Sequence, residues 1–103
     1  MSSNSQKIYN ALQLIPKGKV TTYKLLAEYI GINNPRVIGN ILHKNEDGNI
    51  YPCHRVVRSN GTIASGYAMG GPTEQRKKLR QEGVRFLSNG NVNFSYSLHT
   101  FSS

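Results

Sequence analysis

Residues 21–44, which read TTYKLLAEYIGINNPRVIGNILHK, decide the fold of this chain. Thr22 precedes apolar residues at helical spacing and predicts an N-cap, and Gly31 predicts the end of that helix. Asn33-Asn34-Pro35 offers an Asn cap with Pro at the first helical position, and predicts a following helix that runs to about Lys44. Two short helices joined by a tight turn are typical of a helix-turn-helix arrangement.

The second of these helices has two chemically different sides. One side is apolar and consists of Val37, Ile38, Ile41 and Leu42. The opposite side is polar and consists of Arg36, Asn40 and His43, with Gly39, which has no side chain. Such a polar, basic side is typical of a helix that enters a DNA groove. The ordinary solvated side of an amphipathic helix is the alternative, and periodicity alone does not decide between the two.

Two further helices are predicted on either side of this pair. Helical spacing of apolar residues over Ser5–Leu14 predicts the first, which Pro16 and Gly18 end. The basic stretch Pro72–Glu82 predicts the last, with Leu79 nearly alone as its apolar anchor. The tail from Val84 to Phe101 alternates weakly, which predicts one more strand.

A small β element is predicted between the third and the last helix. Asn60-Gly61 is a strong hairpin signal, and it joins the β-branched runs Ile50–Arg58 and Thr62–Ala64. The predicted fold is therefore mainly α with a small β wing, a winged helix-turn-helix-like DNA-binding domain.

Length and charge bound the kind of protein. The 103 residues are expected to form one domain over 1–103, with its core at about 5–87. A net charge of +8 points to a polyanion, with nucleic acid ahead of an acidic membrane surface. The sequence has no apolar run near the roughly 18 residues of a membrane helix and no signal peptide. We therefore expect a cytoplasmic protein, or a nuclear one in a eukaryote, with no membrane partner.

The single cysteine, Cys53, is the main chemical candidate. It has no second cysteine for a disulfide, and with only three histidines the sequence predicts no zinc cluster and no metal site. A thiol attacks carbon only as thiolate, so a reactive Cys53 needs a neighbouring cation or base, and His54 and Arg55 follow it directly. An inert core thiol is the alternative for an isolated cysteine.

The unit Pro52-Cys53-His54-Arg55-Val56-Val57 resembles the active-site motif of the O6-alkylguanine-DNA alkyltransferases, which repair DNA by removing alkyl groups from guanine O6. The resemblance runs from about Ile8 to about Phe86. Further matches stand at the family's spacing, namely Tyr23 after Lys19-Val20-Thr21-Thr22, Arg36 before Val37-Ile38-Gly39, Asn45, Ser65-Gly66-Tyr67, and Glu82 before Gly83.

The resemblance implies a role for each matching residue. The catalytic group is Cys53, His54, Glu82 and Tyr23, and the DNA-binding group is Arg36, Tyr23, Gly39 and Asn40. The alkyl pocket is formed by Pro52, Val56, Ser65, Gly66, Tyr67 and Ala68, with Asn45 as a hinge and Arg55 as a structural residue.

The implied activity is irreversible transfer of the alkyl group from O6-alkylguanine in double-stranded DNA to Cys53 after base flipping. Each molecule acts once, and no cofactor is needed. The protein is expected to be a monomer that acts as a methylated-DNA–protein-cysteine methyltransferase.

Two other hypotheses stay open. The resemblance covers most of the chain, so we expect the family's N-terminal companion domain to be absent, and the chain then has the size of the alkyltransferase-like proteins, which replace the cysteine and flag the lesion for other repair. A sensor without efficient transfer is therefore one alternative, although Cys53 favours transfer chemistry. A winged-helix transcription regulator with an incidental cysteine is the other. The chain could also be one module of a larger repair polypeptide.

Overall fold

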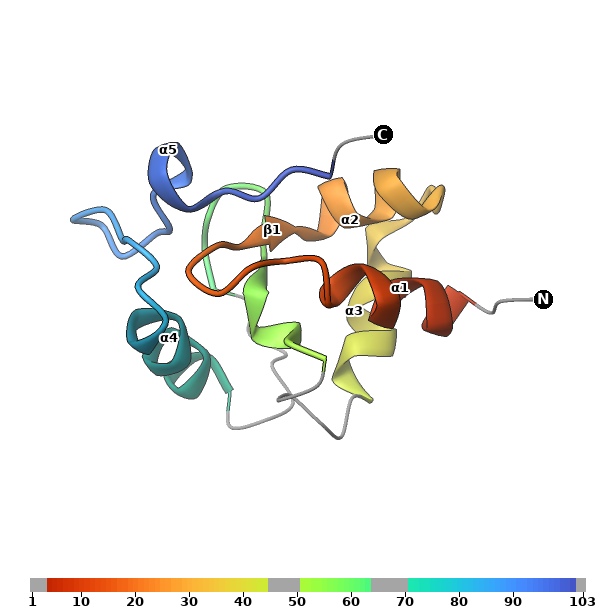
Figure 1. Cartoon of the computed structure of the whole chain (residues 1–103), viewed down its shortest axis with the longest axis horizontal. Coiled ribbons are helices and arrows are strands. Elements are labelled where there is room, and N and C mark those ends of the chain that lie inside the picture. The colour runs from red at the N-terminus through yellow and green to blue at the C-terminus, as the bar shows by residue number, and fades with distance from the viewer. Residues whose placement is uncertain (1–3, 45–50, 64–70, 102–103) are drawn as a thin grey trace.

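The computed structural model describes residues 4–44, 51–63 and 71–101 of the chain. In chain order its elements are α1 (Asn4–Leu12), β1 (Thr21–Thr22), α2 (Tyr23–Ile30), α3 (Pro35–His43), the 3-10 turn η1 (Cys53–Arg55), β2 (Val56–Val57), α4 (Gly71–Gln81) and α5 (Phe94–Ser97). Figure 1 shows α1, α2 and α3 at one end of the long axis and α4 and α5 at the other, with β1 between them. The predicted class, mainly helical with a small β element, is confirmed.

The helix-turn-helix is confirmed together with its predicted caps. The side chain of Thr22 accepts a hydrogen bond from the backbone N–H of Leu25 at 3.0 Å, which satisfies a donor in the first turn of α2. Gly31 ends α2 with φ +90°, a left-handed conformation that glycine adopts without strain. Asn34 caps α3 by accepting from the N–H of Arg36 at 3.0 Å, and Pro35 occupies the first turn.

The two sides of α3 are also as predicted. Ile38 and Leu42 are buried in a core cluster shared with α1 and α2, whereas Arg36, Asn40 and His43 are exposed. A second cluster lies beyond β1 and β2, and consists of Val20, Val57, Leu79, Val84 and Val92. The turn η1 and strand β2 connect the two clusters, because Cys53 and Val56 belong to the first and Val57 to the second.

Within the described residues 51–63, the prediction of a hairpin of two paired strands is wrong, although the Arg58 N–H does donate across the turn to Thr62 O at 3.1 Å. Asn60-Gly61 does form a tight turn, in which the Gly61 N–H donates to Arg58 O at 2.8 Å. Residues 56–57, however, pair in parallel with β1, with Thr21 opposite Val56 and Thr22 opposite Val57. Both valines are fully buried, and a continuous apolar pair of this kind fits a buried parallel strand better than the exposed arm of a hairpin.

The predicted strand in residues 84–101 is also wrong over most of its length. The described tail contains the short helix α5, and the Asn93 side chain caps it by accepting from the Ser95 N–H at 3.0 Å. Only isolated bridges represent β structure there, one joining Phe86 to Val92 and one joining Leu98 in parallel to Val20. The weak alternation reflects these separate contacts and not a continuous strand.

Candidate active site

The candidate nucleophile lies in a short, strongly held turn. Cys53 begins η1 and is 4% exposed. The Arg55 N–H donates to Pro52 O at 3.0 Å, and the Val56 N–H closes the turn on Cys53 O. Because β2 follows at once and pairs with β1, the backbone on the C-terminal side of Cys53 is fixed by the sheet.

The two residues after Cys53 converge on one carboxylate at the end of α4. Arg55 donates from Nε to Glu82 Oε1 at 2.9 Å and from Nη2 to Oε2 at 2.7 Å, and its Nη1 donates to Ile15 O at 2.8 Å. His54 Nε2 lies 3.0 Å from Glu82 Oε1. The bidentate geometry fixes the carboxylate, and the carboxylate in turn lies against the imidazole.

The contact between His54 and Glu82 is short, and its angle departs from that of an ideal hydrogen bond. Both imidazole nitrogens are buried and have no hydrogen bond of good geometry within the described residues. At 3.0 Å the Glu82 oxygen therefore lies off the line of the ring N–H. The carboxylate favours the neutral tautomer that has its proton on Nε2, so Nδ1 carries the lone pair that can accept a proton.

Burial and charge set the protonation of this pair. Burial lowers the pKa of His54 below its ordinary value, and the neighbouring Glu82 carboxylate only partly offsets that effect. Burial alone would raise the pKa of Glu82, but the hydrogen bonds from Arg55 and the contact with His54 outweigh it, and the net pKa is lowered. At neutral pH the site therefore holds a neutral imidazole beside an ionised carboxylate, as a general base requires.

Tyr23 is the first residue of α2. It packs, partly buried, against the core cluster that contains Cys53. Burial raises the pKa of Tyr23, negative charge on Cys53 raises it further, and Arg58 acts in the opposite direction. The phenol therefore stays protonated and is available as a hydrogen-bond donor.

A groove of about 440 Å³ opens beside Tyr23, between the starts of α2 and α3 and the turn after β2. It is lined by Tyr23, Lys24, Pro35, Arg58, Ser59 and Asn60. Two of these side chains are cationic, none is acidic, and Arg36, the exposed first-turn residue of α3, follows Pro35 directly. The surface around the starts of α2 and α3 therefore suits a polyanion.

Gly39 occupies the middle of α3 without an internal reason for being glycine. A Cβ built there meets no atom within 4 Å, and its backbone does not require a positive φ. Glycine inside a helix is destabilising by roughly 0.5–1 kcal/mol relative to alanine. This cost is understandable if another molecule approaches the backbone of α3 closely at this position.

Replacing Gly39 by Ala should accordingly separate stability from binding. We expect the free energy of unfolding to rise by about 0.5–1 kcal/mol because the helix gains propensity. We expect affinity for duplex DNA to fall about tenfold, because the methyl group holds α3 away from its partner. Thermal unfolding and fluorescence anisotropy measure the two effects, and an unchanged DNA affinity would contradict the close approach.

One residue of the site was missed in the sequence. Gln75 of α4 is 1% exposed, and its Nε2 donates to His54 O at 3.0 Å and to Val56 O at 3.1 Å. The available signal was its place four residues before Leu79 on the same helical side, which makes it a buried polar residue that needs a partner.

The remaining predicted residues are not placed. Asn45, Ser65, Gly66, Tyr67 and Ala68 lie outside the described residues. Within the described ranges, no group of three or more His, Cys, Asp or Glu side chains is arranged to hold a metal ion. The helices of those ranges are all too short or too polar to cross a membrane.

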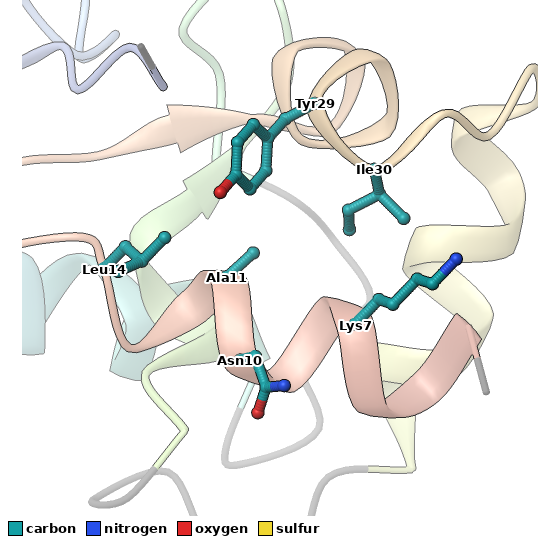
Figure 2. Close-up of a pocket in the computed structure, with 6 residues that line it drawn as sticks. All are labelled: Lys7, Asn10, Ala11, Leu14, Tyr29 and Ile30. Carbon is teal, nitrogen blue, oxygen red and sulfur yellow. The ribbon is translucent and has the colours of Figure 1, made fainter. Parts of the chain in front are cut away.

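A second hollow, of about 390 Å³, lies between α1 and α2 and contains none of the predicted site residues. Figure 2 shows Tyr29 of α2 extending toward the end of α1, where Ala11 and Leu14 lie. Leu14 and Tyr29 are about half exposed, at 54% and 46%. This hollow belongs to the helix packing on the side of α1 and does not contribute to the site around Cys53.

Comparison with known proteins agrees with this geometry. The family described as 6-O-methylguanine DNA methyltransferase, DNA binding domain, matches residues 3–84. A methylated-DNA–protein-cysteine methyltransferase of Candida glabrata is 42% identical over 89 residues, which cover 85% of this chain and 42% of that protein. The alkyltransferase-like protein 1 of Schizosaccharomyces pombe is 37% identical over 79 residues, which cover 76% of this chain and 73% of that protein.

Solved structures give the same result. The S. pombe alkyltransferase-like protein, crystallised with damaged DNA that contains O6-carboxymethylguanine, superposes with a TM-score of 0.77 at 32% identity and covers 94% of this chain and 97% of its own. The O6-methylguanine methyltransferase of Mycobacterium tuberculosis superposes with a TM-score of 0.69 at 29% identity, and the match covers 85% of this chain and 53% of that protein. This chain spans 42% and 32% of the lengths of two curated relatives, the second a bifunctional methyltransferase/endonuclease of Picrophilus torridus. The chain therefore belongs to the DNA-binding-domain family of the O6-alkylguanine repair proteins, which includes both methyltransferases and alkyltransferase-like proteins.

Proposed function

We propose that this protein transfers the alkyl group of O6-alkylguanine in duplex DNA to Cys53, irreversibly and once per molecule. The observation that carries the proposal is the turn that places Cys53 directly before His54, whose Nε2 lies 3.0 Å from Glu82 Oε1. An inert core cysteine needs none of this arrangement.

The chemistry follows from these groups. His54 accepts the Sγ–H proton, through a water molecule, and Glu82 stabilises the imidazolium that forms. The thiolate attacks the alkyl carbon, so that an S–C bond forms while the C–O6 bond breaks and its electron pair remains on the guanine. Tyr23 donates a hydrogen bond to the base as this negative charge develops. The product thioether has no good leaving group, so the protein is consumed in the reaction.

Access to O6 requires a base outside the stack, because O6 lies on the pairing edge of guanine. Arg36 and Asn40 are exposed on the side of α3 that Gly39 leaves open to close approach. Arg36 is suited to enter the stack and fill the space that the extruded nucleotide leaves. The cationic groove beside Tyr23 then faces the displaced phosphate backbone.

The proposal is tested by stoichiometry. Incubating the protein with excess duplex that contains O6-methylguanine should repair lesions up to one per protein molecule and then stop. The restored guanine is counted by digestion and chromatography. Repair that continues over many turnovers, or intact lesions after prolonged incubation, would overturn it.

Replacing Arg36 by Ala should weaken repair of duplex far more than reaction with the free base. The physical reason is that the side chain acts on the stack and not on the thiol. We expect about a tenfold or greater loss in the rate with duplex, since unstacking costs a few kcal/mol, and less than a twofold change with free O6-benzylguanine. Equal losses with both substrates would argue against a role in base extrusion.

The rate of transfer should fall on the acid side with a midpoint below pH 6.5, the ordinary pKa of histidine, because burial lowers the pKa of His54. The same shift makes the folded state bind fewer protons than the unfolded state in that window, so stability also declines as the pH falls below 6.5. Rate and thermal unfolding are measured against pH, with His99→Gln as control because burial also lowers the pKa of His99. A midpoint above 6.5, or one that moves in the control, would contradict the assignment to His54.

A lesion sensor is the second candidate function. One observation favours it: the structural superposition covers 97% of the length of an alkyltransferase-like protein that was crystallised with damaged DNA. A sensor binds the alkylated base tightly but leaves the alkyl group in place. It predicts that the lesion survives digestion of the complex, the opposite of the result expected for transfer.

A further inference from the structure

The side-chain amide of Gln75 is buried against the turn that carries Cys53. Gln75 directs its Nε2 to His54 O at 3.0 Å and Val56 O at 3.1 Å. Both partners are carbonyls, which only accept, so the NH2 end of the amide must face them and each hydrogen has its own acceptor. The residue is 1% exposed, so water does not compete for these bonds.

These bonds supplement the turn's own hydrogen bonds. Within the turn, the Arg55 N–H donates to Pro52 O and the Val56 N–H donates to Cys53 O. Gln75 donates instead to the carbonyls of His54 and Val56, the residues on either side of Arg55. A single side chain thereby fixes the separation of two peptide units and connects them to α4.

The same side of α4 holds the turn at a second point. Gln75, the fully buried Leu79 and Glu82 stand at i, i+4 and i+7 along α4 and its C-terminal end, which places them on one side about two turns apart. Glu82 holds the side chains of His54 and Arg55, whereas Gln75 holds the backbone. His54, the residue that follows Cys53, is therefore held through both its backbone carbonyl and its imidazole.

We propose that Gln75 is a positioning residue for alkyl transfer, holding the backbone of His54 and Val56 so that the Cys53 sulfur and the His54 imidazole meet the substrate in reactive alignment. This inference rests on the proposed function. Gln75 belongs to α4, whereas the exposed side that we assign to DNA belongs to α3, so its effect is expected on the chemical step and not on DNA binding. Small misplacements of reacting groups are enough to slow such a step by one to two orders of magnitude.

The test is single-turnover kinetics with O6-methylguanine duplex on wild type, Gln75→Met, Gln75→Lys and Gln81→Met. Met matches the length of Gln without a donor, Lys keeps N–H donors, and exposed Gln81 on the same helix is the matched control. For Gln75→Met we expect the maximal rate constant to fall about tenfold or more, while the DNA concentration at half-maximal rate changes less than twofold. We expect Gln75→Lys to recover most of the rate and Gln81→Met to match wild type.

The outcomes separate this inference from the proposed function. A wild-type protein that transfers no methyl group overturns both. A wild type that transfers, with Gln75→Met equally fast, overturns the positioning role alone, and so does a Gln75→Met that only weakens DNA binding. If Gln75→Met does not fold, Gln75→Lys decides, because a folded Lys variant slower than wild type by tenfold would show that the donor is not what matters.

Discussion

Replacing Cys53 by Ala should abolish methyl transfer and leave affinity for lesion-containing duplex within about threefold of wild type. The loss is complete because this chain has no second cysteine and the mechanism has no other nucleophile at the turn. Binding is expected to survive because the phosphate contacts and the exposed side of α3 supply most of it. Digestion of the duplex measures transfer, and anisotropy at fixed salt measures affinity.

Cys53→Ser is the matched variant, since it keeps the size of the side chain but replaces a thiol by a hydroxyl that is not ionised at neutral pH. We expect it to be as inactive as Cys53→Ala. Residual transfer by either variant would place the nucleophile elsewhere. An affinity lost by orders of magnitude would instead show that the thiol itself is needed to hold the lesion.

Replacing Glu82 by Ala should damage both stability and transfer. The side chains of Glu82 and Arg55 are 14% and 15% exposed, so the substitution leaves a largely buried guanidinium without its carboxylate. Breaking a buried pair in this way costs about 3 kcal/mol, which lowers the unfolding temperature of a domain of this size by about 10 °C or more. Transfer should fall about a hundredfold or more, because His54 loses the charge that stabilises its protonated form.

Thermal unfolding and the single-turnover rate, both measured well below the unfolding temperature, check these effects. Glu28→Ala is the matched control, because Glu28 is an exposed carboxylate on α2 and its removal should change neither quantity. A Glu82→Ala protein that remains as stable as wild type would contradict the buried pair. One that is destabilised but transfers at the wild-type rate would contradict the link to His54.

The features of the fold that the sequence predicts correctly are local ones. The caps Thr22, Gly31 and Asn34 are local, since each acts on backbone groups within four residues, and all three were predicted correctly. The pairing of Val56 and Val57 depends on β1, more than thirty residues earlier, and the local hairpin signal at Asn60-Gly61 pointed to the wrong partner.

The candidate site divides in the same way. Cys53 and His54 are predicted as catalytic candidates because they are adjacent in the sequence, whereas Glu82 is predicted only by the family resemblance. The position of Glu82, at hydrogen-bond distance from both His54 and Arg55, depends on how α4 packs against η1. For Gln75 the sequence indicates only a polar residue on the same helical side as Leu79, and not the backbone carbonyls that it binds.

Alkyl transfer to Cys53 is tested most directly by the mass of the peptide that carries this residue after the protein has reacted with a duplex containing O6-methylguanine. We expect this peptide to gain the mass of one methyl group, fragmentation to place the gain on Cys53, and the duplex to contain guanine where the lesion was. An unmodified peptide beside an intact lesion, under conditions where the protein is bound to the duplex, would contradict alkyl transfer.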